Sequence, residues 1–282
     1  MTTPRVAAIH DMSGFGRCSL TVAIPILSAM GVQCCPLPTA FLSTHTGGFE
    51  GFTFLDMTDE MPKVADHWAS LGLSFQAIYS GFLGSERQIG IVADFIRRFR
   101  RPDTVVVIDP VMGDHGRVYQ TYTPAMCDGM ARLAELADVI TPNLTEAALL
   151  LDRPYDALPE DEAGLLEITQ ELSQGGRRSV VLTGASAAPD LTGAACFDAA
   201  TGRAQMIQTR RVPREFHGTG DVFSSVLTGA LVRGASLAEA AGEAAGFVRA
   251  CAERTAAEDL PMREGVDFEP LLGRLTAGRE GV

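Results

Sequence analysis

Short runs of β-branched and apolar residues alternate along the chain with longer segments whose apolar positions recur at helical spacing. The short runs are typical of buried strands and the longer segments of amphipathic helices. Six runs are predicted to be strands: residues 6–9, 32–37, 77–80, 104–108, 139–141 and 180–182. The helices expected between them cover residues 20–30, 59–71, 86–99, 124–136 and 160–172. This alternation predicts repeated βα units around a mostly parallel sheet.

The pattern changes after residue 182. Residues 193–198 and 204–209 flank a Thr201-Gly202 turn and are expected to form a β-hairpin. Two alanine-rich helices are predicted to follow, over residues 222–233 and 237–254. No repeat or linker interrupts the series, so a single domain over residues 1–282 is the economical prediction. In open α/β sheets ligands bind beyond the carboxyl ends of the strands, so chemistry is expected there.

Composition and charge narrow the class of protein. Apolar residues make up 46% and charged residues 21%, which is typical of a globular protein with a full-sized core. The net charge of -12 argues against a nucleic-acid partner, because backbone binding depends on clustered Lys and Arg. A single nucleotide is not excluded, since backbone amides and a metal can hold it. No GK[ST] motif is present, so a P-loop is excluded.

The cysteines and the N-terminus bear on location. Six cysteines are scattered without metal-ligand spacing and are expected to be reduced thiols. Nothing at the N-terminus resembles a signal peptide, and no stretch of about 18 apolar residues predicts a membrane span. The expectation is a cytoplasmic protein without a membrane partner.

A glycine-rich segment, HGTGD at residues 217–221, lies between a proline-containing loop and an apolar helix. Its glycines let the backbone turn tightly, so that amides at the helix start can converge on an anion favoured by the helix dipole. Asp221 is expected in the first helical turn, where it can accept the proton of an attacking hydroxyl. The structural alternative is that Asp221 only caps the helix or compensates its dipole.

Two acidic segments directly follow predicted strands: DPVMGD at residues 109–114 and TPNLTE at residues 141–146. Carboxylates there suit Mg²⁺ and phosphate chemistry, because hard cations take carboxylate oxygens directly or through water. Asn143 and Glu146 are three residues apart, so both can reach one side of a helix start. The structural alternatives are a turn opened by Asp109 and a capping interaction between Asn143 and Glu146.

Together these segments resemble the pyridoxal kinase branch of the ribokinase superfamily, from about residue 6 to about residue 254. GTGD at residues 218–221 is similar to the superfamily's anion hole and catalytic base, and NLTE at residues 143–146 looks like its NxxE magnesium motif. These two motifs identify a small-molecule kinase without choosing the substrate. The resemblance implies a ribokinase-like three-layer α/β/α sandwich with a mostly parallel central sheet of about eight to ten strands.

Three further stretches resemble pyridoxal kinases in particular. STHTG at residues 43–47 is similar to a segment that lies over the pyridine ring, SGFLGS at residues 80–85 to the family's SGYLGS, and DPVMG at residues 109–113 matches directly. The resemblance assigns catalysis to Gly218, Thr219, Gly220 and Asp221, and substrate binding to Asp11, Ser13, His45, Thr46, Gly47 and Phe82. It assigns ATP binding to Asp109, Thr141, Asn143, Glu146, Thr183 and Val212, with Mg²⁺ at Asp109 and Glu146.

Two departures from the family pattern bear on the substrate. The family often has Tyr where Phe82 stands, and Asp11 occupies the place of a usual serine, with Ser13 two residues further on. This first loop looks partly like that of the hydroxymethylpyrimidine kinases of thiamine synthesis.

The expected reaction is transfer of the γ-phosphoryl group of ATP to the 5′-hydroxymethyl group of pyridoxal, pyridoxamine or pyridoxine, which gives pyridoxal 5′-phosphate or its analogue. The alternatives are a hydroxymethylpyrimidine kinase and a noncatalytic protein that binds pyridoxal phosphate. Asp221 and the GTGD glycines weigh against the second, because a carrier needs no base or anion hole. The resemblance also implies a homodimer and a monovalent cation such as K⁺.

Overall fold

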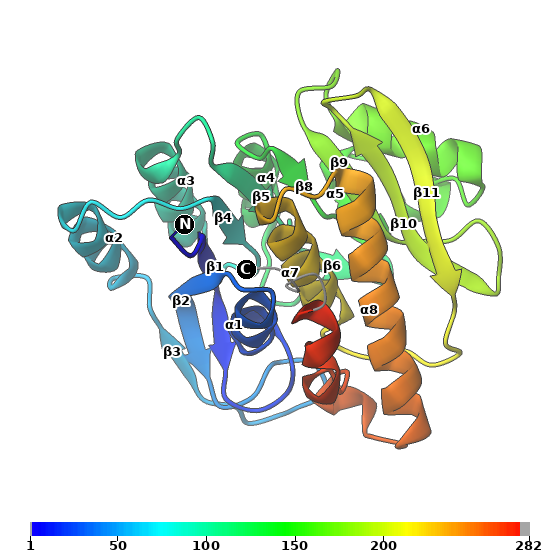
Figure 1. The fold of residues 1–282 in the computed structure, drawn as a ribbon, viewed down its shortest axis with the longest axis horizontal. Coiled ribbons are helices and arrows are strands. Elements are labelled where there is room, and N and C mark those ends of the chain that lie inside the picture. The colour runs from blue at the N-terminus through cyan, green and yellow to red at the C-terminus, as the bar shows by residue number, and fades with distance from the viewer. Residues whose placement is uncertain (1, 277–282) are drawn as a thin grey trace.

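The computed structural model describes residues 2–276, through which one nine-stranded sheet runs (Figure 1). Its strands are β1 (Arg5–Ser13), β2 (Gln33–Leu42), β3 (Phe54–Asp56), β4 (Ala77–Ser80), β5 (Val105–Ile108), β8 (Val139–Ile140), β9 (Ser179–Ala185), β10 (Leu191–Asp198) and β11 (Arg203–Arg210). Their order across the sheet is β11-β10-β9-β8-β5-β4-β1-β2-β3. The strands from β9 to β2 are parallel, whereas β3, β10 and β11 pair antiparallel. A separate ribbon joins β6 (Gly113–Asp114) to β7 (Arg117–Val118).

Helices cover both faces of the sheet. The α-helices are α1 (Ser19–Ala29), α2 (Met61–Ser70), α3 (Glu86–Phe99), α4 (Pro124–Ala134), α5 (Leu144–Leu150), α6 (Glu162–Leu172), α7 (Thr219–Val232) and α8 (Leu237–Ala257). Short 3₁₀ turns are η1 (Tyr155–Ala157), η2 (Met262–Glu264) and η3 (Glu269–Thr276). Helices α1, α7 and α8 pack on one face, and α2, α3, α4 and α6 pack on the other. None of the described helices is long and apolar enough to cross a bilayer.

The central strands are apolar on both sides because both faces are covered. In β4, Ala77 and Tyr79 belong to the apolar cluster under α7 and α8, while Ile78 belongs to the cluster under α3 and α4. All three side chains are fully buried. A charge introduced at any of them would therefore lie in one of the two cores.

The predicted three-layer α/β/α fold with a mostly parallel sheet is confirmed. The strand over residues 77–80, the helix over residues 86–99 and the hairpin after residue 182 also lie where the pattern placed them. The predicted domain spans residues 1–282, of which residue 1 and residues 277–282 lie outside the described part of the chain.

The first predicted strand was too short. Strand β1 continues to Ser13, with a register shift between His10 and Met12, so Asp11 lies at a bulge inside the strand rather than in a loop. A bulge re-aims the side chains beside it, which is common next to binding sites. The helix predicted from residue 222 begins earlier, at Thr219.

Candidate active site

The carboxyl ends of the parallel strands bring the predicted catalytic and nucleotide segments together. Asp109 and Thr141 each follow a central strand, and helix α7 approaches them across the sheet. Ser224 of α7 hydrogen-bonds through its hydroxyl to Asp109 (3.3 Å) and to Thr141 (3.0 Å). Three segments far apart in the sequence therefore meet at one edge of the sheet, as the rule for open α/β sheets predicts.

The glycine-rich segment forms the start of α7. Gly218 is the N-cap residue with a φ of 76°, and no side chain caps the helix. A Cβ atom at Gly218 would lie 2.0 Å from the carbonyl oxygen of Arg17, so the close approach admits only glycine. Because no side-chain acceptor among the described residues occupies the first amides of α7, they are available to an anion. The alternative that Asp221 caps this helix is therefore wrong, whereas compensation of the helix dipole stays open.

Asp221 lies in the first turn of α7 and is half-buried. Burial raises its pKa to about 7; the nearby Asp11 carboxylate adds to the rise, and the backbone amide of Ser19 opposes it. A carboxylate with a pKa near neutrality is well matched to accept a proton at working pH. The position and the pKa both suit a general base.

Glu146 and Asn143 form the capping box that the structural alternative described. The Asn143 side chain accepts from the amide of Glu146 (2.9 Å), and Glu146 accepts in return from the amide of Asn143 (2.9 Å). The other oxygen of Glu146 accepts from the amide of Met112 (3.2 Å). Glu146 is only 3% exposed, so these bonds fix a buried carboxylate at the site.

Asp109 and Glu146 are both buried carboxyl groups whose pKa values are raised. Burial, and then the Asp221 carboxylate, raise the pKa of Asp109 to about 8, against the hydroxyls of Ser224 and Thr141. Burial, and then the charge of Asp109, raise the pKa of Glu146 well above its ordinary value. Buried carboxylates that repel one another are a donor set that a hard divalent cation stabilises. The residues present therefore fit Mg²⁺.

Asp11, predicted to bind the substrate, lies near the end of β1. It is 6% exposed and accepts hydrogen bonds from the hydroxyls of Ser13 (3.0 Å) and Ser19 (2.5 Å). Burial raises its pKa, and these two hydroxyls oppose that rise. Because Asp11 also raises the pKa of Asp221, the predicted substrate residues and the predicted base share one site.

His45 fixes the loop that was predicted to cover the substrate ring. Its Nδ1 accepts from the amide of Gly47 (3.0 Å), so the ring proton is on Nε2, which donates to the carbonyl of Arg263 (2.6 Å). The His45 ring lies 5.5 Å from that of His217, the first residue of the glycine-rich segment. Burial, and then the facing His45, lower the pKa of His217. The ring loop and the anion-binding segment are thus neighbours.

The remaining predicted residues are placed less uniformly. Thr46 is exposed, whereas the hydroxyl of the neighbouring Thr44 is buried without a hydrogen-bond partner. Phe82 is half-buried, with its ring 6.0 Å from that of Tyr122. Thr183 donates to the carbonyl of Pro142 (3.3 Å), which joins it to the nucleotide segment. Val212 instead packs on the apolar cluster under α7 and α8.

Sequence reasoning missed a group of buried polar side chains near Asp109 and Asp221. Both ring nitrogens of His10 and the hydroxyls of Tyr79, Ser80 and Ser225 are buried without a hydrogen-bond partner among the described residues. Such a group costs about 1–3 kcal/mol when left unpaired. Burial lowers the pKa of His10 to about 3, so its ring is neutral. The signal was Ser225, a polar residue four positions after Asp221 in a mostly apolar helix.

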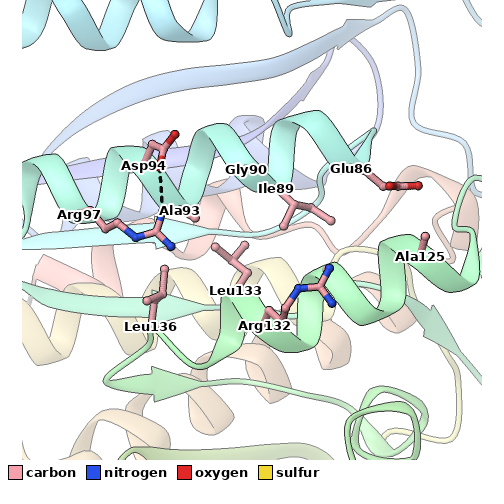
Figure 2. Close-up of a pocket in the computed structure, with 11 residues that line it drawn as sticks. Glu86, Ile89, Gly90, Ala93, Asp94, Arg97, Ala125, Arg132, Leu133 and Leu136 are labelled. Carbon is pink, nitrogen blue, oxygen red and sulfur yellow. Dashed lines mark hydrogen bonds and ion pairs between the residues drawn. The ribbon is translucent and has the colours of Figure 1, made fainter.

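A separate groove of about 380 Å³ runs between α3 and α4 (Figure 2). Ile89, Leu133 and Leu136 form its apolar floor, and Arg97 and Arg132 lie at its sides. None of the predicted site residues lines it. The groove is therefore distinct from the carboxylate-lined edge of the sheet.

Two solved structures share the fold over nearly the whole chain. One is a candidate phosphomethylpyrimidine kinase from Bacteroides thetaiotaomicron, crystallised with pyridoxal; it is 45% identical, with a TM-score of 0.91 over 97% of this chain and 96% of that chain. The other is pyridoxal kinase from Lactobacillus plantarum, which is 32% identical, with a TM-score of 0.88 over 98% of each chain. The fold and the site place the protein in the ribokinase-like class of small-molecule kinases.

A family model for phosphomethylpyrimidine kinases matches residues 24–265, so the chain belongs to that family, and its relatives include pyridoxal kinases of the ribokinase superfamily. A pyridoxine/pyridoxal/pyridoxamine kinase of Bordetella bronchiseptica is 29% identical over 266 residues, 89% of each chain. A hydroxymethylpyrimidine/phosphomethylpyrimidine kinase of Rhizobium meliloti is 27% identical over 265 residues, 94% of this chain and 95% of the relative. Two related activities are thus named among its relatives.

Proposed function

We propose that the protein transfers the γ-phosphoryl group of ATP to the 5′-hydroxymethyl group of pyridoxal, pyridoxamine or pyridoxine. The observation that carries the proposal is Asp221, a carboxylate with a pKa of about 7 beside the uncapped amides of α7 and next to Asp11. This arrangement offers a proton acceptor and an anion site within reach of one substrate alcohol. The similar Bacteroides protein that was crystallised with pyridoxal supports a vitamin B6 substrate.

In the proposed reaction, Asp221 accepts the proton of the substrate hydroxymethyl group. The oxygen of that group attacks the γ-phosphorus, and ADP leaves. The amides of residues 218–220 stabilise the negative charge that develops on the transferred group. Asp109 and Glu146 would hold Mg²⁺, which supplies charge neutralisation at the phosphates. Both oxygens of Glu146 already accept backbone amides, so contact through a bound water suits it. Thr141 and Thr183 would contact the nucleotide from the ends of their strands.

The substrate ring is proposed to lie between Asp11 and the loop that carries His45 and Thr46. Buried Asp11 offers oxygens to a polar substituent of the ring, and the loop supplies a cover that excludes water. Ser13 holds Asp11 in place by a hydrogen bond. Phe82 offers a half-buried aromatic face in place of the family's usual tyrosine.

The proposal includes a cytoplasmic homodimer that uses K⁺ as a monovalent cation. Phe41, Phe54 and Leu55 expose large apolar side chains at the β2–β3 edge of the sheet, which supports burial against a second copy. Sedimentation of the purified protein measures the assembly. Activity in K⁺ compared with Na⁺ at equal ionic strength measures the cation requirement.

A second candidate activity is phosphorylation of a hydroxymethylpyrimidine. It is favoured by Asp11, which stands where pyridoxal kinases usually carry serine, and by the named activity of the Rhizobium relative. Both substrates present a hydroxymethyl group on a six-membered nitrogen ring, so the same base and anion site would serve either. The two functions differ only in how the ring is held.

One assay separates the candidates. ADP production is measured in a coupled enzyme assay. Pyridoxal, pyridoxamine, pyridoxine and the pyrimidine alcohol are tested as separate substrates. The proposal expects turnover of at least one vitamer with a higher kcat/KM than the pyrimidine alcohol. Turnover of the pyrimidine alone would assign the second activity. No turnover, together with tight binding of pyridoxal phosphate, would identify a noncatalytic binding protein.

A further inference from the structure

Residues 263–269, which we call the strap, lie late in the chain and contact two loops of the candidate site, at Arg17 and at His45. Val266 and Phe268 are buried at 0% and 1% exposure in the cluster shared with α1, α7 and α8. The amide of Asp267 donates to the hydroxyl of Thr255 in α8 (2.8 Å). The strap is therefore anchored in the core through alternate residues, which leaves the others to face the loops.

The strap contacts the loop between β1 and α1 at Arg17. The amide of Arg17 donates to the carbonyl of Glu264 (3.0 Å). Its guanidinium group donates to Asp267 (3.0 Å) and to Glu269 (2.8 Å). Gly265 lies against it so closely that a Cβ atom there would sit 2.8 Å from Arg17 atoms. A backbone hydrogen bond, two ion pairs and the close packing of Gly265 thus hold Arg17 in place.

Arg17 in turn fixes the start of α7. Its carbonyl oxygen occupies the space that a Cβ atom at Gly218 would fill, at 2.0 Å. A displacement of Arg17 therefore opens or crowds the turn whose amides face the anion. At its other end the strap holds the ring loop, because the carbonyl of Arg263 accepts from His45 (2.6 Å) and its guanidinium lies 5.2 Å from the ring of Phe49.

We propose that the strap is a positioning element for phosphoryl transfer, in which Asp267 acts through Arg17 on the amides of the α7 start. The inference rests on the proposed function, because it assigns those amides to the transferred group. Such donors stabilise a transition state only where they are correctly placed, so a small displacement costs rate. The pair between Arg17 and Glu269 is partly exposed, and such pairs contribute little to global stability. Asp267 is only 7% exposed and also accepts from Arg254 of α8 (2.6 Å), so its removal should cost more stability. Loss of the Arg17 guanidinium should therefore lower turnover more than it lowers the melting temperature.

The first test uses Arg17→Gln, which removes only the charge of Arg17, and Asp267→Asn, which also breaks the ion pair of Asp267 with Arg254 of α8 (2.6 Å). We expect kcat to fall about ten- to hundredfold, while the KM values for ATP and for the vitamer change less than twofold. Asp267→Glu should restore part of the lost turnover. The control is Arg153→Gln, which breaks a partly exposed ion pair with Glu171 (2.9 Å) outside the site and should leave kcat unchanged.

A second readout needs no activity. Hydrogen exchange of the first hydrogen-bonded amides of α7, at residues 222–225, should be faster in Asp267→Asn and in Arg17→Gln when it is measured by mass spectrometry in the ligand-free protein. Of these amides, Val222 donates to Gly218 (3.0 Å), the residue against which Arg17 packs. Exchange should be unchanged in Arg153→Gln. If Asp267→Asn does not fold, Glu269→Gln loosens the same guanidinium from its other partner. Unchanged exchange at residues 222–225 in a folded variant would overturn the proposal, whichever substrate the protein is found to phosphorylate.

Discussion

The proposed phosphoryl-transfer side of the site and the proposed ring-binding side differ in how their side chains are held. On the first side, Glu146 is fixed by Asn143 three residues away, and Asp221 lies in the first turn of the helix whose N-cap is Gly218. On the second side, His45 bonds to a carbonyl 218 positions later in the chain. The side chains proposed for phosphoryl transfer are therefore placed by local motifs, whereas the ring loop is held by long-range packing.

This comparison predicts different kinetic signatures for the two sides. Substitutions on the phosphoryl-transfer side should lower kcat by a similar factor for every accepted alcohol. Substitutions on the ring side should change KM, and by amounts that depend on the substituents of the ring. An enzyme in which both sides gave the same signature would contradict the division.

The largest effect is expected for Asp221→Asn, which keeps the shape of the side chain and removes the proton acceptor. A positioned general base contributes roughly 10² to 10⁴ in rate, so kcat should fall by that factor. The KM for ATP should move much less. A residue that only compensates the helix dipole would cost at most about 1 kcal/mol of stability and leave turnover nearly intact. A thermal melt and a steady-state assay on one preparation separate the cases.

The pH profile tests the same residue without substitution. Because the pKa of Asp221 is raised to about 7, the carboxylate is protonated and inactive at lower pH. We expect kcat/KM to fall about tenfold per pH unit below pH 7 and to level above it. The residual activity of Asp221→Asn should lack this acid limb. An acid limb that persists unchanged in the variant would assign the titration to another group.

The next largest effect is expected for Glu146→Gln. Glutamine can still accept at the third position of the capping box, so the helix start should persist while one negative charge is lost. Loss of a supporting carboxylate at a metal site typically costs 10- to 100-fold in metal affinity or activity. The Mg²⁺ concentration for half-maximal turnover should rise by a factor in that range. A Mg²⁺ titration that matches the wild type would remove Glu146 from the metal site.

On the ring side, Thr46→Val should raise the KM for the vitamers with little change in kcat. One hydrogen bond contributes about 0.5–1.5 kcal/mol, which corresponds to a factor of about two to thirteen. Thr44→Val is the matched comparison, because Thr44 lies two residues before Thr46. The Thr44 hydroxyl is buried without a hydrogen-bond partner among the described residues. If Thr44→Val raises KM and Thr46→Val does not, the ring contact belongs to Thr44.

The smallest effect is expected for Tyr79→Phe, which lies beneath both sides. Its hydroxyl has no hydrogen-bond partner among the described residues, so its removal should leave stability unchanged or increase it by up to about 1 kcal/mol. Urea unfolding with a constant slope measures the change. A loss of more than about 2 kcal/mol would mean that the hydroxyl is paired, for example to a buried water.

The sequence predicts where the segments proposed for phosphoryl transfer meet, because their signals are local. Strand ends followed by DPVMG and TPNLTE, and a GTGD helix start, mark one sheet edge without knowledge of packing. Strand β1 was underestimated because His10 and Asp11 interrupt its apolar run, although the pairing with β2 continues. Helix α5 has 7 residues and β3 has 3, too few for a period to show.

The strap could not have been predicted from its own residues. Its segment shows no strand or helix period, and its value to the site arises only when Val266 and Phe268 enter a core built by α1, α7 and α8. The burial of Tyr79 and the lack of a partner for its hydroxyl are likewise products of packing. The residue types suited to the chemistry could be recognised in the sequence, whereas the contacts that orient their side chains could not.

The strap also ties the activity of the protein to the order of its synthesis. Arg17 leaves the ribosome early, and its partner Glu269 is added 252 residues later. At about 5–20 residues per second the first loop waits roughly 10 to 50 s for the segment that holds it. We expect the nascent chain to build its sheet during that interval with the loop still loose. A chain that stops short of the strap should then fold in large part and yet remain a poor kinase.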